Sequence, residues 1–306
     1  MKTKCGSMQR SMRSNIYGVL ARSKAPRILI WQKQAGIPSE LLVRIQGGVM
    51  EFKVGVYENV PYPEYAEIEA FRSHDLTSVI KCPYTWKHQG PMKETPALIE
   101  GRVQHCVFLE LDKFDEEFVI EPNVDRRTKA GKEEYEDFKA GIGDRTPIKQ
   151  DMYDVCMDRR KVVEEYVPRG TDKVELTVCF YWHNHPFKAR FDWYDGKNVW
   201  DLKTARDASP RGFKNAINGF NYYMQAALYL EAARASNLPA EQFMFLAQEK
   251  LHPYPFAVYT LSDEAIEYGK AKNEQALKTL LECKDNDDYK PFNVTGTQVV
   301  ELGDLW

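Results

Sequence analysis

The chain has 306 residues, of which 43% are hydrophobic and 28% are charged, a composition typical of a soluble globular protein with one large domain or two small ones. No stretch approaches the roughly 18 consecutive apolar residues that a membrane span requires, so we expect no membrane contact. The net charge of −3 neither indicates nor excludes binding to nucleic acid, because a basic groove can be local.

The cysteines and the N-terminal residues bear on the compartment in which the chain works. Six cysteines are present and none forms a Cys-x-x-Cys pair, which argues against structural zinc and against a disulfide framework. We therefore expect reduced thiols in a cytoplasm. Residues 1–39 contain no Asp or Glu, and we interpret residues 1–55 as a basic arm that is disordered or touches nucleic acid. The alternative is a transit peptide.

The first half of the chain predicts helices joined by irregular segments. A strand-like run lies at 27–31, and residues 56–69, rich in Pro and Tyr, are expected to be extended. A helix is expected over 75–88 with an interruption at Pro83, because proline lacks the amide donor that a helix interior needs. The other expected elements are a helix over 96–109, a charged, mobile and partly helical excursion over 121–150, and a helix over 150–165.

The second half predicts a three-stranded meander followed by alternating helices and strands. Apolar and polar residues alternate over 174–182 and again over 187–193, which is typical of strands. Asp195-Gly196 is a favoured two-residue hairpin turn, and residues 199–204 return as the next strand. The remaining elements are a helix over 210–235, strands over 243–248 and 256–260, and a helix over 263–283. This order predicts an α/β or α+β fold with a mixed sheet.

The expected hairpin brings two acidic residues and a lysine to one face of the sheet. With the turn centred on Asp195-Gly196, Asp192 lies opposite Val199, so Asp192, Asp201 and Lys203 share a face. Asp192 and Asp201 then become diagonal neighbours, roughly 7 Å apart at the backbone. Leu202 points to the other face and is expected to anchor the strand in the core.

This arrangement predicts a divalent metal site. Two close carboxylates repel each other unless a cation lies between them, and oxygen ligands suit Mg²⁺ or Mn²⁺. Hydrolysis of a phosphodiester needs neutralised charge at the phosphate and an activated water, which a nearby lysine can orient. The alternative is a solvated Asp–Lys pair on a strand, and this is the more frequent meaning of an isolated Asp-x-Lys.

The motifs around this pair add a family resemblance. Asp192 together with Asp201-Leu202-Lys203 resembles the signature of the PD-(D/E)XK nucleases, in its Asp-x-Lys form. Gln225 and Tyr229, at i and i+4 on the next helix, resemble the Gln-x-x-x-Tyr motif of the RecB-like branch. The segment Gly101-Arg102-Val103-Gln104-His105 resembles the helix whose histidine completes the metal site in that branch.

Four further segments narrow the resemblance to the RecE exonuclease family (exonuclease VIII) of phages and prophages. They lie at 56–61, 95–98, 124–132 and 248–250, and the similarity covers about residues 56–293. The resemblance implies a restriction-endonuclease-like core, with a central mixed β-sheet flanked by helices, over residues 56–295. Residues 1–55 would be an extension and residues 296–306 a C-terminal tail.

The resemblance also implies roles for the residues of the site. His105, Asp192, Asp201 and the Leu202 carbonyl would hold Mg²⁺, for which Mn²⁺ would substitute, and Lys203 would serve the attacking water. Gln225 and Tyr229 would contact the DNA backbone or brace the site. The alternatives are a structural histidine and a polar stripe on a packed helix. Some nucleases carry an iron–sulfur cluster on C-terminal cysteines, but only Cys283 lies in that region here, so we expect none, and no zinc.

Other polar residues are weaker candidates. Glu175 and Glu249 are each interpreted as a ligand of a second metal ion or as an acid that contacts the metal ligands without binding the metal. A salt-bridge role is equally compatible with the sequence. Six basic residues are expected to grip DNA phosphates and to make binding salt-dependent: Arg126, Arg127, Lys129, Lys132, Arg206 and Lys214. Trp182 and Trp193 are expected in the core. His183-Asn184-His185 matches the name of another nuclease class, but we place it in a turn between two strands.

The resemblance implies an activity and partners as well. The family digests one strand of linear double-stranded DNA from 5′ to 3′, leaves a 3′ single-stranded tail, works with a single-strand annealing protein of the RecT type and forms a ring-shaped homo-oligomer. The alternatives are a structure-specific or single-strand nuclease of the same fold, and a catalytically inactive DNA-binding recombination protein. A CRISPR-associated nuclease is disfavoured because the cysteine cluster is missing.

Overall fold

The computed structural model describes residues 28–29, 54–90 and 93–292. The expected tail at 296–306 and nearly all of the expected arm at 1–55 lie outside the described residues. Within the described part, no helix combines the length and the apolar character that crossing a bilayer requires.

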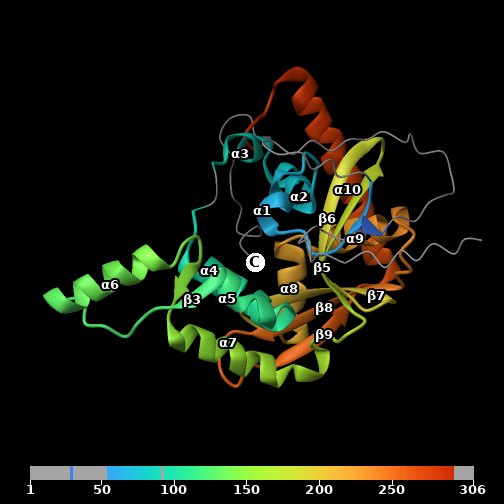
Figure 1. The fold of residues 1–306 in the computed structure, drawn as a ribbon. Coiled ribbons are helices and arrows are strands. Elements are labelled where there is room, and N and C mark those ends of the chain that lie inside the picture. Colours follow the sequence, from blue (N-terminus) through green and yellow to red (C-terminus); the bar gives the residue numbers. More distant parts are fainter. Residues whose placement is uncertain (1–27, 30–53, 91–92, 293–306) are drawn as a thin grey trace, which may run out of the picture.

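A seven-stranded mixed sheet forms the centre of the molecule (Figure 1). Its order is β1-β2-β5-β6-β7-β8-β9, and only β7 and β8 run parallel to each other. This confirms the mixed α/β fold that the alternation of strands and helices predicts. The strands are β1 (Ile28–Leu29), β2 (Gly55–Tyr57), β5 (Lys173–Trp182), β6 (His185–Tyr194), β7 (Asn198–Ala205), β8 (Gln242–Glu249) and β9 (Phe256–Thr260).

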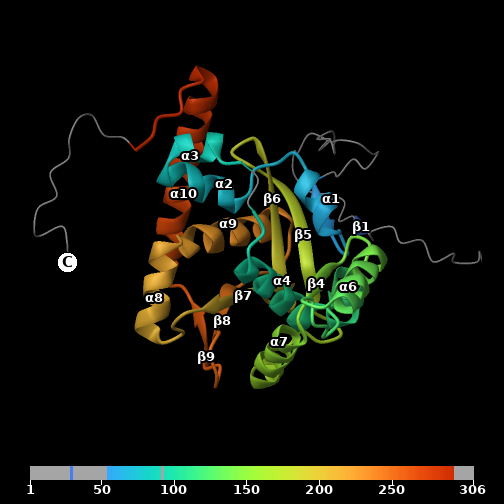
Figure 2. The same ribbon diagram turned by 90° about the vertical axis from the view of Figure 1, so that its left-hand side faces the viewer.

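Helices cover the sheet on both sides, since each sheet face must bury its apolar side chains. Figure 2 shows α2, α9 and α10 on one side of the long strands β5 and β6, with α4 and α7 near their lower ends. The helices are α1 (Tyr62–Glu67), α2 (Ser73–Lys81), α3 (Pro83–His88), α4 (Pro96–Leu109), α5 (Phe114–Glu117), α6 (Lys129–Gly141), α7 (Gln150–Val162), α8 (Pro210–Gly219), α9 (Tyr222–Ala235) and α10 (Asp263–Asn286).

Several expected elements are confirmed and others are wrong. The helix at 96–109 and the strand at 256–260 appear with the expected bounds, and Pro83 does divide α2 from α3. Residues 56–69 are not extended throughout, because Pro63 lies in the first turn of α1, where a missing amide donor costs nothing. A small parallel pair, β3 (Phe118–Ile120) with β4 (Thr146–Ile148), was not anticipated.

The helix expected over 210–235 is two helices. Asn221 adopts a left-handed conformation, with φ 56° and ψ 38°, between the end of α8 and the start of α9. Asparagine tolerates this region better than most residues, and one such residue is enough to turn the chain. The break therefore separates Phe220 from Tyr222 and changes the direction of their side chains.

The turn between β5 and β6 is a tight one. His183 and Asn184 both have positive φ, 48° and 62°, as a two-residue turn of the primed type requires, and Trp182 pairs with His185. The His183-Asn184-His185 tripeptide thus lies in a turn between two strands, as expected. Trp182 and Trp193 are buried, which confirms their place in the core.

The turn between β6 and β7 differs from the expected two-residue turn. Tyr194 pairs with Val199 and Trp193 with Trp200, so four residues connect the strands. The carboxylate of Asp195 explains the longer loop, since it accepts hydrogen bonds from the amides of Lys197 and Asn198, at 2.8 and 2.6 Å, and from the Trp200 indole. The register is shifted by two residues, an even number, so the same residues share a face.

A buried lysine holds α1 against the sheet. Lys188 of β6 is 3% exposed, and its Nζ donates to the carbonyls of Tyr65, Ala66 and Ile68 at 2.8, 3.0 and 2.8 Å. Burial lowers the pKa of Lys188 to about 8, so the ammonium stays charged at neutral pH with three acceptors for its three N–H groups. These carbonyls belong to the last residues of α1 and to Ile68, which follows it, so the lysine ties the end of this helix to β6.

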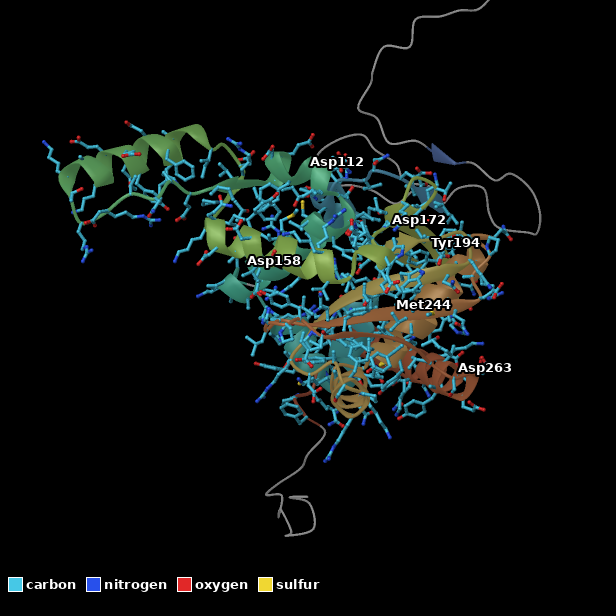
Figure 3. The ribbon with its side chains drawn as sticks, turned by 90° about the horizontal axis from the view of Figure 1, so that it is seen from below. Asp112, Asp158, Asp172, Tyr194, Met244 and Asp263 are labelled. Carbon is cyan, nitrogen blue, oxygen red and sulfur yellow. The ribbon has the colours of Figure 1, made fainter. Side chains whose placement is uncertain are left out.

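Helix α6 stands apart from the other elements. Figures 1 and 3 both show α6 extending away from the body of the molecule. Helix α7, marked by Asp158 in Figure 3, lies against that body. The labels of Tyr194, at the end of β6, and of Met244, in β8, show the reader where the sheet lies in Figure 3.

Candidate active site

The alternation of side chains along β6 inverts at Asp192. Phe191 packs with Leu176 in the core against α9, whereas Trp193, two residues on, packs with Leu202 and Phe108 in a second cluster. Residues two apart normally share a face, so the strand changes phase at Asp192. The opposite strand does the same at Glu175, which has φ 48°.

This double irregularity brings two acidic residues together. Val174 pairs with Trp193 and Leu176 with Phe191, while Glu175 and Asp192 between them stay outside the ladder. A positive φ at a residue other than Gly costs free energy of order 1–3 kcal/mol, and such residues concentrate at functional sites. In this protein the irregular backbone at Glu175 and Asp192 places their two carboxylates opposite each other.

His105 completes this group from the helix α4. One ligand atom each of His105, Glu175 and Asp192 lie within 4.8 Å of one another, and His105 Nδ1 lies 3.7 Å from Asp192 Oδ2. The His105 side chain is 35% exposed and that of Asp192 14% exposed, so the group opens to solvent on the side of α4. An imidazole and two carboxylates are a donor set that suits a divalent cation.

Asp192 also joins β6 to β7 beyond the last paired residues. Its Oδ2 accepts a hydrogen bond from the Leu202 amide at 2.7 Å. The Leu202 side chain is buried on the opposite face with Trp193 and Leu246, as expected of an anchor in the core. The carboxylate is therefore fixed by β7 on one side and by His105 on the other.

Asp201, Lys203 and Gln225 form a closed polar triangle next to Asp192. Gln225 Nε2 donates to Asp201 Oδ1 at 2.7 Å, and Lys203 Nζ lies 2.7 Å from Asp201 Oδ2 and donates to Gln225 Oε1 at 3.1 Å. The Asp201 and Lys203 side chains are 3% and 19% exposed. The alternative of a solvated Asp–Lys pair is therefore wrong.

Burial and charge shift two pKa values in the site. Burial raises the pKa of Asp192 to about 7; His105 opposes the shift, while Asp201 and Glu175 add to it. Burial disfavours the charge on Lys203, but Asp201 and Asp192 outweigh it and raise the pKa of the lysine. Lys203 is thus a permanent cation, whereas the charge of Asp192 is poorly compensated and fits a bound cation.

The sequence-predicted ligands divide between the two groups. His105 and Asp192 lie in the cluster with Glu175, whereas the Asp201 carboxylate is turned towards Lys203 and Gln225. The ligand roles of Asp201 and of the Leu202 carbonyl stay predictions. Glu175 serves in two ways, since it belongs to the cluster and also accepts from the Arg190 guanidinium.

Glu249 and Tyr229 lie around the site in different ways. Glu249 accepts from the Ala208 amide at 2.9 Å and so braces the loop before α8. Tyr229, one helical turn beyond Gln225, packs on Phe191 with 5.3 Å between the ring centroids and a tilt of 38° between the rings. Burial, with Tyr65, Asp201 and Asp192 adding to it, raises the pKa of Tyr229 well above its ordinary value, so its hydroxyl stays protonated.

The predicted DNA-binding residues fall in two places. Arg126, Arg127 and Lys129 lie at or just before the start of α6 and pair with Glu121, Asp125 and Glu133, and Lys132 is exposed on the same helix. Arg206 and Lys214 lie instead after Lys203, exposed, and within the described part of the chain neither forms an ion pair. Their contacts with DNA stay predictions.

Replacing Glu175 with Gln is expected to weaken Mn²⁺ binding about 10- to 100-fold, because the cluster loses one of its two carboxylate charges. Calorimetric titration of the protein with Mn²⁺ measures this. The matched control is Glu249→Gln, which keeps an acceptor for the Ala208 amide and lies outside the cluster. Equal Mn²⁺ affinity in wild type and Glu175→Gln would remove Glu175 from the site.

Two comparisons with known proteins bear on the fold and the family of the chain. A family model described as a PDDEXK-like domain of unknown function matches residues 76–295. A protein from Eubacterium rectale, named as a proposed exonuclease, has a similar fold in its crystal structure, with a TM-score of 0.51 and 12% identity over 78% of this chain and 92% of that chain. No curated protein matches. Because the family model spans well over half of the sequence, the chain belongs to this family of PDDEXK-like domains.

Proposed function

We propose that this protein is a metal-dependent nuclease that hydrolyses phosphodiester bonds of DNA. One observation carries the proposal: the kinked strands β5 and β6 hold Glu175 and Asp192 beside His105, while the adjacent strand holds a buried Asp201–Lys203 pair. A metal-capable cluster next to a fixed cation is what hydrolysis of a phosphodiester requires.

The residues of the site divide the work. A divalent metal bound by the cluster would neutralise charge on the phosphate and acidify water there. Lys203 is held protonated by Asp201, so it donates hydrogen bonds and positive charge to the phosphate or to the attacking water, and does not act as a base. Gln225 contacts both Asp201 and Lys203 and fixes their orientation.

We further propose an exonuclease of the RecE type. Two observations support it: the resemblance of the segments around the site to that family, and the shared fold with a protein named as a proposed exonuclease. The proposed activity is 5′-to-3′ digestion of linear double-stranded DNA in the presence of Mg²⁺. The proposed partners are a RecT-like annealing protein and further copies of the chain in a ring, and the proposed place is the bacterial cytoplasm.

Digestion of a linear duplex labelled separately at each 5′ and each 3′ end tests this function. With Mg²⁺ the 5′ label is expected to leave as a short product while the 3′-labelled strand stays long, and with EDTA neither label is released. Release of the 3′ label first would reverse the polarity. Cleavage of single strands or branched DNA alone would indicate a structure-specific nuclease of the same fold, and no hydrolysis with Mg²⁺ or Mn²⁺ would contradict the proposed activity.

A further inference from the structure

A cavity of about 570 Å³ lies next to Lys203, and His105 is not among the residues that line it. We call it the side cavity; its walls include Lys203, Arg206, Phe213, Asn215, Phe220 and Tyr222. Its volume falls in the range of about 300–1,000 Å³ that is usual for small-ligand sites. The proposed hydrolysis involves only the phosphate, so it gives this space no role.

Two aromatic rings lead from Lys203 to the mouth of the side cavity. The Tyr222 ring lies 4.6 Å from Lys203 Nζ, and the Phe220 ring lies 5.4 Å from the Tyr222 ring with an angle of 23° between their planes. The left-handed Asn221 between them makes this stack of residues i and i+2 possible. The side cavity thus has a continuous π-surface that begins at the catalytic cation.

Phe220 is unusually exposed for its size. Its exposed fraction is 66%, and among the large apolar side chains of the described residues only Leu251 exceeds it. Phe213, by contrast, is buried at 1% and forms the floor against Phe245 and Tyr259. One ring therefore anchors the cavity in the core while another is free to stack on a ligand.

Two polar side chains of the side cavity suit a nucleotide, while the carboxylate of Asp207, which also lines it, accepts from the Ser209 amide at 2.9 Å. Arg206 is exposed at the wall and, within the described part of the chain, forms no ion pair, so its guanidinium is available for a phosphate. Asn215, also exposed, offers an amide donor and acceptor to the edge of a base. Aromatic stacking with a cation beside it is the usual way in which proteins hold unpaired bases without reading their identity.

We infer that the side cavity receives the unpaired base of the terminal nucleotide of the strand being shortened, stacked on Phe220 and Tyr222, while its phosphate lies at Lys203. The inference rests on the proposed nuclease function and adds the form of substrate: a strand end whose last base has left the duplex stack. Because every base has a π-face, this site accepts all four bases and suits sequence-independent digestion.

Binding of two matched DNA ends tests the inference without requiring hydrolysis. Two linear duplexes are compared, identical except that the last nucleotide of the shortened strand carries a base in one and is abasic in the other. Fluorescence anisotropy in EDTA is expected to show about 5- to 150-fold tighter binding of the end with the base. The double variant Phe220→Ala/Tyr222→Ala is expected to bind both ends equally, Phe220→Ala to lose most of the preference, and Phe220→Tyr to keep it.

Phe292→Ala is the matched control, since Phe292 is a phenylalanine of similar exposure, 61%, that does not line the side cavity. It is expected to keep the wild-type preference. Equal binding of both ends by the wild type, or a preference that Phe220→Ala leaves undiminished, would overturn the inference. Failure of hydrolysis with Mg²⁺ and Mn²⁺ contradicts the proposed function separately, because the binding measurement needs neither.

Discussion

Asp201→Asn is expected to lower metal-dependent DNA hydrolysis about 10³-fold while leaving DNA binding within about twofold of wild type. The Asp201 side chain is nearly inaccessible and holds Lys203 Nζ at 2.7 Å and Gln225 Nε2 at 2.7 Å. Asparagine keeps the volume but removes the charge, so the lysine loses the ion pair that fixes it and the site loses a carboxylate. Hydrolysis of an end-labelled duplex measures the rate, and anisotropy in EDTA measures binding.

The control for this variant is Asp158→Asn, the same change at an exposed residue of α7, where the carboxylate only pairs with Lys161 (Figure 3). It is expected to keep the wild-type rate. Wild-type hydrolysis by Asp201→Asn would disprove the assignment of the active site. A rate loss accompanied by an equal loss of DNA binding would instead point to a folding defect.

Asp192→Asn is expected to stabilise the metal-free protein and to abolish both activity and stabilisation by metal. The folded pKa of about 7 lies above the ordinary value of 3.8, so between about pH 4 and pH 7 the folded state binds more protons than the unfolded state. The free energy of unfolding of the metal-free wild type therefore falls as pH rises through this window. Asparagine carries no charge, so the variant does not lose stability as the pH rises, and its side-chain oxygen can still accept the hydrogen bond from the Leu202 amide.

Urea denaturation at pH 5 and pH 8 measures this effect. In EDTA at pH 8 the variant is expected to exceed the wild type by about 2–4 kcal/mol in the free energy of unfolding, and at pH 5 by much less. Mg²⁺ at about 100 times its Kd should add about 2.7 kcal/mol to the wild type only. Lower stability of the variant at pH 8, or equal stabilisation of both proteins by Mg²⁺, would contradict a metal role for Asp192.

Much of the sheet could be predicted because alternation and turn residues act locally. The strands β5 to β9 follow the expected segments, and α4 begins at Pro96 because the Thr95 side chain caps it, accepting from the Leu98 amide at 3.3 Å. The break at Asn221 was missed although Asn218, Gly219 and Asn221 are poor helix formers, because a few such residues do not by themselves show where a helix ends.

The site was predicted in part for a physical reason. The predicted pairing of β6 with β7 was wrong by two residues, because the hydrogen bonds of Asp195 lengthen the turn and a rule based on residue types does not include them. A shift by an even number of residues keeps each side chain on its predicted face of the sheet, so Asp192, Asp201 and Lys203 were still placed together. The role of Glu175 was left open between a metal site and a salt bridge, although counting back from the tight turn at His183-Asn184 places it opposite Asp192. The kink at both residues, and the turning of Asp201 towards Gln225, depend on packing that no local pattern records.

The anchoring of α1 by Lys188 bears on how the protein can be cut for expression. The family model begins at residue 76, but β2 covers the edge of β5 from Gly55 to Tyr57, and residues of α1 together with Ile68 supply the three acceptors of Lys188. A recombinant fragment that starts at residue 76 would leave a bare strand edge, ready to pair with another chain, and would remove all three acceptors of the Lys188 ammonium. A fragment meant to stay monodisperse should therefore retain Gly55 and the residues that follow it.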